Sequence, residues 1–173
     1  TYLEGPKVMQ RPIVGFGIDE EGAPLAFLSC GHAQHVRHNP PFFNRPWVLT
    51  EAGRAAMLGQ ALNCVRCDHL ELPDRFIARD RTPAFTEVSL PPRLRQGHKT
   101  SVGVWARVVV VAGSLRYRVA SLSIDKTLSP LEAANIPPEV GFRLEPLGEV
   151  HFYLDVYWTE HSQLAGLLAA QER

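Results

Sequence analysis

The four residues Cys64-Val65-Arg66-Cys67 carry the strongest structural information in this 173-residue sequence. Two thiols separated by two residues form a common clip for a transition metal. The third cysteine, Cys30, is followed at two-residue spacing by His32. In an extended segment, residues two apart point the same way, so Cys30 and His32 can face one ion together. The two pairs predict a structural zinc site with four ligands: Cys30, His32, Cys64 and Cys67.

Three other histidines are alternatives to His32 as the fourth ligand: His35, His38 and His69. A redox dithiol is the other interpretation of the Cys-x-x-Cys pair, but no βαβ pattern flanks it. An odd number of cysteines is a poor disulfide framework, and the sequence starts without a basic segment followed by an apolar one. We therefore expect a protein of the reducing cytoplasm.

The sequence around the clip predicts a small α+β domain over residues 1–73. Two apolar segments that flank an acidic turn predict a β-hairpin over residues 12–29. Thr50 precedes an alanine-rich segment and predicts, as its N-cap, a helix from about residue 51 to residue 62. A domain this small often needs a staple in addition to its core, which the metal would provide.

Residues 74–173 predict a mostly β domain that ends in a short C-terminal helix. The apolar, β-branched segment 102–112 predicts a strand, and the following Gly113-Ser114 predicts a tight turn. Residues 150–158 alternate between apolar and polar side chains, as expected for a half-buried strand, whereas residues 125–141 are rich in proline and predict a loop. The expected fold class is α+β, mostly β: a small zinc-binding α+β domain followed by an antiparallel β-barrel.

Several short motifs occur together in the first half: Leu28-Ser29-Cys30-Gly31-His32, His35-Val36-Arg37-His38, Asn44-Arg45-Pro46-Trp47 and Cys64-Val65-Arg66-Cys67. With these motifs, residues 10–69 resemble a small bacterial domain of unknown function that is sometimes labelled pressure-regulated open-reading-frame-like. The resemblance implies a shared Cys/His cluster and brings no known activity.

The second half carries another set of motifs: Gly97-His98-Lys99-Thr100, Gly103-Val104-Trp105-Ala106-Arg107 and Glu145-Pro146-Leu147-Gly148-Glu149-Val150. With them, residues 83–158 resemble the cupin-like domain of tellurite-resistance proteins. The resemblance implies a cupin-like double-stranded β-helix and an association with oxyanion or metal stress. Related resistance proteins owe their enzyme activity to an attached methyltransferase domain. No Gly-rich nucleotide-binding βα unit occurs in this sequence, so we expect no methyl transfer.

The match to the cupin-like domain departs from its pattern at one expected metal ligand. His98 and Asp155 match polar positions of that domain, but Phe142 stands where the resemblance places a histidine. A phenyl ring cannot coordinate a divalent ion, so we expect no catalytic metal in the barrel. His151 shares a strand face with Asp155 and is the available substitute.

A small anion, such as an oxyanion, is the ligand that we expect in the barrel. His98, Trp105 and Arg107 are its expected binding residues, because arginine offers a bidentate fork to an oxyanion. Arg116 and Tyr117 on a neighbouring strand could join them. The alternative is that Trp105 fills the barrel while the arginines face water.

The aromatic and basic residues of the first half have two interpretations. Phe42, Phe43 and Trp47 are expected to cover the metal site and the helix, rather than to form a recognition surface. Arg37, Arg45 and Arg54 are expected to be solvated or to support the site by hydrogen bonds, rather than to form an anion-binding patch.

The charge balance restricts the expected partners. The sequence has 18 Lys and Arg against 18 Asp and Glu, and it contains no basic cluster, so we expect no nucleic acid partner. No segment approaches the roughly 20 apolar residues of a membrane span, so we expect no membrane partner. The aromatic-rich strand at residues 150–158 offers an apolar face for a homodimer through the barrel.

Together these features favour a non-enzymatic protein with a structural zinc site and a barrel that binds a small ligand or a partner. The rival function is a metalloenzyme with an open site, made either from the Cys/His residues of the first half or from His98, His151 and Asp155. A zinc-ribbon nucleic-acid binder is the third alternative, which the neutral charge disfavours.

Overall fold

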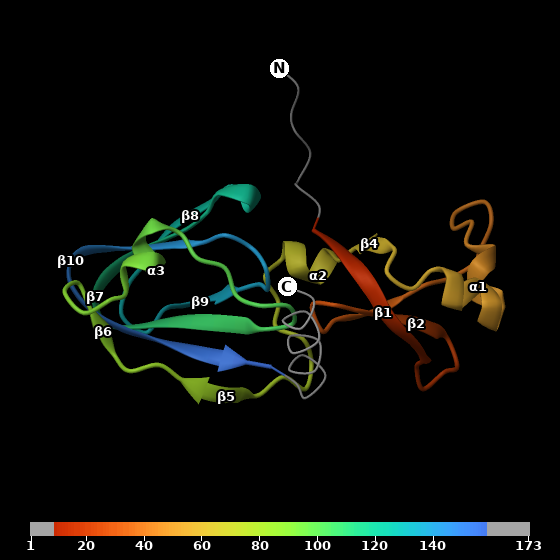
Figure 1. Cartoon of the computed structure of the whole chain (residues 1–173), viewed down its shortest axis with the longest axis horizontal. Helices are drawn as coiled ribbons and strands as arrows, with labels where there is room; N and C mark the ends of the chain where they lie inside the picture. Colours follow the sequence, from red (N-terminus) through yellow and green to blue (C-terminus); the bar gives the residue numbers. More distant parts are fainter. Residues whose placement is uncertain (1–8, 159–173) are drawn as a thin grey trace, which may run out of the picture.

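The computed structural model describes residues 9–158 and contains two antiparallel sheets, each packed on its own core (Figure 1). Over these residues the helices are short and few, so the predicted mostly β, α+β fold class is confirmed. The C-terminal helix that the sequence predicts lies outside the described residues. Within the described part of the chain, no helix has the length and apolar character needed to cross a membrane.

The first sheet has four strands in the order β3-β2-β1-β4: β1 Gln10–Ile18, β2 Pro24–Leu28, β3 Ala33–His35 and β4 Ala61–Asn63. β1 and β2 form the predicted hairpin. Its turn is fixed by the Asp19 carboxylate, which accepts hydrogen bonds from the backbone N–H groups of Glu21 and Ala23.

Three short helices accompany this sheet: η1 Pro46–Leu49, α1 Glu51–Ala56 and α2 Val65–Asp68. Thr50 caps α1 as predicted, because its hydroxyl accepts a hydrogen bond from the Gly53 N–H at 3.0 Å. The predicted helix length is wrong, since α1 ends at Ala56. Gly59 and Gln60 bond the backbone of Ile13, and the chain continues as β4 along β1.

The second sheet has six strands: β5 Ala78–Arg81, β6 Phe85–Thr86, β7 Trp105–Val119, β8 Ile124–Leu128, β9 Ala133–Ile136 and β10 Arg143–Tyr157. Two short helical segments connect them: α3 Pro92–Gln96 and η2 Ala120–Leu122. The main order is β5-β10-β7-β8, while β6 also pairs with β10 and β9 with β7. The prediction of a loop at residues 125–141 is therefore wrong over much of its length.

The two longest strands, β7 and β10, curl around the barrel core. The tight turn predicted at Gly113-Ser114 is wrong, because β7 passes through both residues without reversing. Gly113 has a φ of +78°, and a Cβ placed there would lie 1.9 Å from the Glu149 carbonyl oxygen. The register of β7 against β10 shifts at this point, between Pro146 and Val150. The glycine thus permits a close-packed bulge that bends both strands.

The two cores meet at a junction that includes three long-range hydrogen bonds. Trp105 belongs to β7 but is buried in the core of the first sheet, where its indole N–H donates to the Cys30 carbonyl oxygen at 2.8 Å. The Asn135 amide donates to the Leu70 carbonyl oxygen, and Arg11 Nη2 donates to that of Pro138. The domain boundary at residues 73 and 74 stays a prediction.

Candidate metal centre

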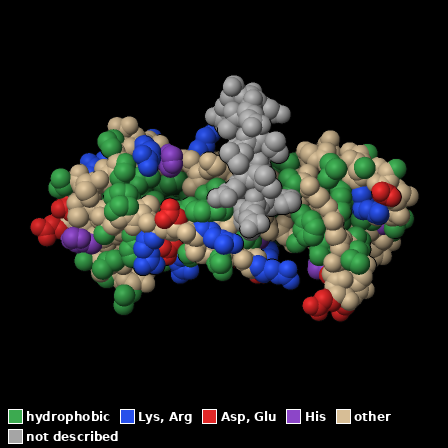
Figure 2. All heavy atoms as spheres, turned by 60° about the horizontal axis from the view of Figure 1, so that its bottom comes forward, with side chains coloured by type: hydrophobic (Ala, Val, Ile, Leu, Met, Phe, Trp, Pro, Cys, Tyr) green, Lys and Arg blue, Asp and Glu red, His purple; other side chains and the backbone are tan. Residues whose placement is uncertain are grey.

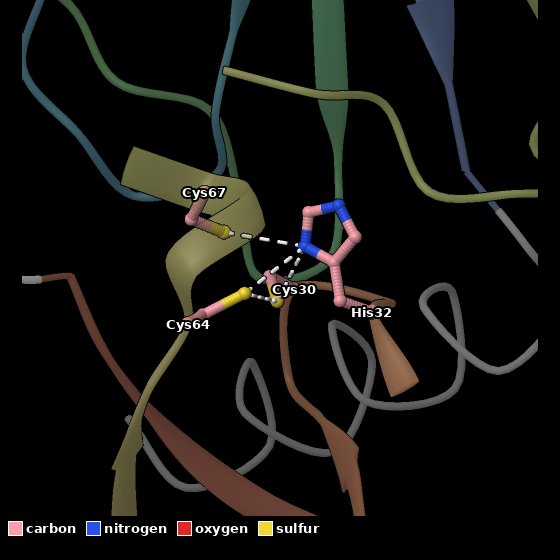
Figure 3. A group of neighbouring side chains, drawn as sticks. All are labelled: Cys30, His32, Cys64 and Cys67. Atoms are coloured by element: carbon pink, nitrogen blue, oxygen red, sulfur yellow. Dashed lines mark hydrogen bonds between the residues drawn. The ribbon is translucent and has the colours of Figure 1, made fainter. Parts of the chain in front are cut away.

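The structure brings Cys30, His32, Cys64 and Cys67 together, with their four ligand atoms within 4.8 Å of one another (Figure 3). Cys30 and His32 lie in the turn between β2 and β3. Cys64 directly precedes α2, and Cys67 lies within that helix. Among residues 9–158 this is the one group of at least three His, Cys, Asp or Glu side chains whose ligand atoms converge in this way.

Four distances within the cluster are close to the edges of a zinc tetrahedron. His32 Nδ1 lies 3.3 Å from the sulfur of Cys30, 3.2 Å from that of Cys64 and 3.5 Å from that of Cys67. The sulfur atoms of Cys30 and Cys64 are 3.7 Å apart. Zn–S bonds of about 2.3 Å and Zn–N bonds of about 2.05 Å give tetrahedral edges of about 3.6 Å from N to S and about 3.8 Å from S to S. The cluster can therefore hold a metal ion with little rearrangement.

The local backbone explains why the two ligand pairs face each other. Gly31 has a φ of +95°, which lets the chain turn tightly between Cys30 and His32. The turn is closed by the Leu28 N–H, which donates to the His32 carbonyl oxygen at 2.9 Å. On the other side, one turn of α2 places Cys64 and Cys67 on the same side of the helix.

His32 is held in the orientation that a ligand needs. Its Nε2–H donates to the Glu71 carbonyl oxygen at 2.8 Å, which leaves Nδ1 to face the three sulfur atoms. The Trp105 ring meets the imidazole edge-on, with the ring centroids 5.5 Å apart. The histidine is thus fixed from both halves of the chain.

The other histidines weighed as ligands lie elsewhere. His35 Nε2 donates to the Asp19 carboxylate at 2.7 Å, and His38 Nδ1 accepts a hydrogen bond from the Arg45 N–H at 3.0 Å. His69 is exposed beyond the end of α2. None of these three belongs to the converging group in the described residues.

The charges in the cluster favour a bound cation. Burial alone would lower the pKa of His32, but hydrogen bonds with Cys30 and Cys64 outweigh it and raise the pKa of His32 to about 9. Hydrogen bonds with Cys30 and Cys67 lower the pKa of the Cys64 thiol, whereas those with Cys30 and Cys64 raise that of Cys67. One thiolate is therefore stable here, and further thiolates need a compensating charge such as a divalent ion.

All four ligands are buried, with 0% to 1% of each residue exposed. All three cysteines are free of disulfide bonds. A closed set of four protein ligands leaves no coordination position for water or substrate, which is typical of structural rather than catalytic metal sites.

A second candidate site is a cavity of about 900 Å³ at one end of the barrel. Of the three residues predicted to bind an anion, only His98 lines it. Trp105 is instead buried beside His32, and Arg107 is exposed outside the cavity lining. The prediction that these three residues form one site is therefore corrected, because β7 directs Trp105 and Arg107 away from the barrel interior.

The other predicted members of that site are also engaged elsewhere. Arg116 forms a bidentate ion pair with Asp125, at 2.9 Å and 2.7 Å. Tyr117 is buried in the barrel core, where its hydroxyl donates to the Asn135 carbonyl oxygen and its burial raises the pKa of the phenol. Neither side chain is available to bind a ligand as the sequence suggested.

The sequence did not single out the cationic residues that line the cavity: Lys99, Arg118 and Arg143. Arg118 is paired with Glu145, but within the described part of the chain neither Lys99 nor Arg143 forms an ion pair. The acidic lining residues are neutralised, Asp125 by Arg116 and Glu139 by Arg11 at 3.7 Å. The cavity therefore presents unpaired positive charge.

The residues weighed for a cupin metal do not converge in residues 9–158. His98 meets the ring of the buried Phe142 edge-on, at a centroid distance of 5.9 Å. His151 is exposed, and the Asp155 carboxylate is held by Arg81 at 2.6 Å and 3.1 Å. Burial and the positive charge of Arg93 both lower the pKa of His98, which favours the neutral form of this cavity residue.

Two protein-family models match the chain. Residues 14–71 match the family described as protein of unknown function (DUF3565), and residues 80–154 match the TehB-like domain. These matches confirm the resemblances that the motifs of the two halves indicate. No curated protein matches the sequence.

Several solved structures resemble parts of the chain. TehB from Haemophilus influenzae is 22% identical with a TM-score of 0.46, and the match covers 50% of this chain and 32% of TehB. A protein from E. coli strain K12 is 21% identical with a TM-score of 0.47, covering 52% and 98% of the two chains. A cupin-2 domain containing protein from Shewanella frigidimarina is 18% identical with a TM-score of 0.30, covering 35% and 55%. The chain thus spans about a third of TehB.

Proposed function

We propose that the chain is a non-enzymatic binding protein in which a structural zinc centre stabilises the first half and fixes it to a ligand-binding barrel. The observation that carries the proposal is the geometry of Cys30, His32, Cys64 and Cys67: four buried ligand atoms at the spacing of a zinc tetrahedron. Three sulfur ligands and one imidazole suit zinc, which has no redox chemistry and prefers a closed tetrahedral site.

The metal would join two segments that are otherwise far apart in sequence. Cys30 and Cys64 are separated by 34 positions, and both lie in a core of modest size. Because the ligands converge only in the folded state, the binding free energy of the ion adds to the free energy of unfolding. Thiolate ligands must remain reduced, which supports a reducing cytoplasm as the location of the protein.

The cavity of the barrel would bind a small oxyanion. Lys99 and Arg143 have no ion-pair partner among residues 9–158 and offer positive charge there, while the carboxylates of the lining are already paired. The resemblance to the cupin-like domain of tellurite-resistance proteins supports tellurite, or a related oxyanion, as the ligand and a role in stress resistance.

A pair of measurements tests this function. Elemental analysis of the purified chain is expected to find one zinc per molecule. Calorimetric titration with tellurite, selenite, sulfate and phosphate is expected to show binding that Arg143→Ala or Lys99→Ala weakens about tenfold. Arg107→Ala removes an exposed arginine outside the cavity and is the matched control. Equal effects of all three variants would contradict the assignment of the cavity.

The rival function, a metalloenzyme, predicts a different response to ligand replacement. If the site is structural, replacing Cys64 by alanine removes the zinc and lowers the free energy of unfolding of the chain. A variant that stays folded without zinc and loses a measurable turnover would instead favour the enzyme.

A homodimer through the barrel stays a prediction. The strand that was expected to offer its apolar face, β10, lies inside the sheet between β7 and the short strands β5 and β6. Its side chains Val150 and Phe152 are buried in the core of the barrel. A dimer would therefore need another surface.

A further inference from the structure

The loop at residues 36–45, which connects β3 to η1, is rigidly closed although it contains no regular structure. Val36 anchors its start in the core of the first sheet. Asn39 and Phe43 exchange two backbone hydrogen bonds, at 2.7 Å and 2.9 Å. His38 Nδ1 accepts a third hydrogen bond from the Arg45 N–H. These hydrogen bonds hold the backbone of the loop in one conformation, which lowers the entropy cost of ordering the loop on binding.

The tip of this loop exposes two aromatic rings to solvent. Phe42 is 81% exposed and Phe43 is 48% exposed, so the expectation that they cover the metal site is wrong. The Arg45 guanidinium stacks over the Phe43 ring, 5.5 Å from its centroid. Phe42 has the more exposed of the two rings, and exposed aromatic rings are a known platform for stacking bases.

The loop also concentrates positive charge. Residues 22–50 contain no Asp or Glu, whereas the whole chain is balanced and Figure 2 shows basic and acidic side chains interspersed over the barrel. A cavity of about 230 Å³ is lined by His35, Arg37, Phe43 and Arg45. Within residues 9–158, neither Arg37 nor Arg45 forms an ion pair, and the nearby Asp19 is bonded to His35.

The neutral charge of the whole chain led to the expectation of no nucleic acid partner, but the acid-free stretch at residues 22–50 departs from that average. We propose that this loop binds a nucleotide phosphate, as it occurs in a segment of single-stranded nucleic acid. The phosphate would lie in the small cavity between Arg37 and Arg45, and a base would stack on Phe42. The size of the cavity suits one phosphate group rather than a whole nucleotide, which leaves the base outside, at the exposed ring. The inference does not depend on the anion proposed for the barrel cavity.

A nucleotide can use both the arginine-lined cavity and the exposed aromatic ring of the loop. An acidic peptide uses only the arginines. A carboxylate would pair with the two arginines but would give the exposed Phe42 ring no flat partner. Every base has a π-face, and stacking on aromatic side chains tolerates any sequence. With one phosphate held by the two arginines, binding is expected to be weak and to depend on salt, with a slope of about −0.7 in log K against log[salt].

The test is fluorescence anisotropy of a labelled ten-nucleotide oligo(dT) with the full zinc-loaded chain at low salt. Phe42→Ala and Arg37→Ala are each expected to weaken binding at least about fivefold. Leu131→Ala, at an exposed apolar residue of the barrel, and Arg107→Ala are the matched controls and are expected to leave the affinity unchanged. Circular dichroism and zinc content show whether each variant remains folded.

Competitors distinguish the ligand classes. Displacement of the oligonucleotide by thymidine monophosphate shows that one nucleotide is enough, and displacement only by a longer strand shows that several are needed; either result supports nucleotide recognition. Displacement by oligo-glutamate at the same charge concentration would overturn it in favour of an acidic peptide. No binding at millimolar protein, or equal losses in the control variants, would also overturn it.

Discussion

His32 presents its Nδ1 to three sulfur atoms because its Nε2–H is already bonded to the Glu71 carbonyl oxygen. This backbone acceptor does more than hold the ring, since it fixes which nitrogen is free to coordinate. The sequence predicts the four ligands through their spacing. It does not reveal the carbonyl oxygen that orients one of them, because that contact spans 39 positions and uses a backbone atom.

Replacing His32 tests its role as a ligand. We expect His32→Ala to reduce zinc affinity at least about a hundredfold, because it removes both a ligand and the hydrogen bond behind it. His32→Cys is expected to keep the ion in a four-sulfur site, and His69→Ala, at an exposed residue, to leave affinity unchanged. Competition with a chromophoric chelator measures the three affinities. An unchanged affinity in His32→Ala would show that another residue is the ligand.

Acid is expected to release the metal. Coordination needs an unprotonated Nδ1 on His32 and deprotonated thiols, so protons compete with the ion. Because the pKa of His32 is about 9 in the metal-free cluster, its proton must leave whenever metal binds below that pH. The apparent zinc affinity is then expected to fall at least about tenfold for each pH unit lost between about pH 8 and pH 6. An affinity that does not change with pH, in the same chelator assay, would contradict the ligand set.

At the scale of elements, Gly113 is the residue on which the two longest strands depend. Gly113→Ala is expected to destabilise the chain by about 2–5 kcal/mol, since the added methyl meets the Glu149 carbonyl oxygen and φ is positive. Gly22→Ala is the control, because φ is also positive there but no atom lies within 4 Å. It is expected to cost about 1–2 kcal/mol. Urea unfolding measures the free energy of unfolding of both variants. Equal losses would show that the close contact at the bulge does not contribute to stability.

Local sequence patterns predicted the elements of the first half better than those of the second. The hairpin of β1 and β2 and the Thr50 cap depend on neighbouring residues, and both predictions are confirmed. The sequence at Gly113 predicts a turn, because the residues around a glycine do not distinguish a β-bulge from a chain reversal. Only the partner strand, at residues 143–157, determines which of the two occurs.

At the scale of the whole molecule, Trp105 links the Cys/His cluster to the barrel. It lies on the barrel strand β7, yet it contacts His32 and bonds the Cys30 carbonyl oxygen. The alternation of side chains along β7 predicts on which face of the strand Trp105 lies. It does not predict which of the two cores packs against that face. The second core on the outer side of the barrel explains why Trp105 is not a ligand-binding residue.

Trp105→Phe tests this junction. The substitution keeps an aromatic ring but removes the indole N–H, so the buried Cys30 carbonyl oxygen loses its donor. We expect a loss of about 1–3 kcal/mol in the free energy of unfolding and a weaker affinity for zinc. Replacing the half-buried Trp47 by phenylalanine is the control and is expected to have a smaller effect on zinc affinity. Equal zinc affinities in both variants would show that the junction does not support the site.

The most direct test of the central claim is urea unfolding of the purified chain before and after treatment with a strong chelator, together with its metal content. We expect one zinc ion per chain, whose removal lowers the unfolding midpoint and changes the fluorescence of the tryptophan beside the site. Metal-free protein that unfolds cooperatively at the same midpoint with and without chelator would contradict the account.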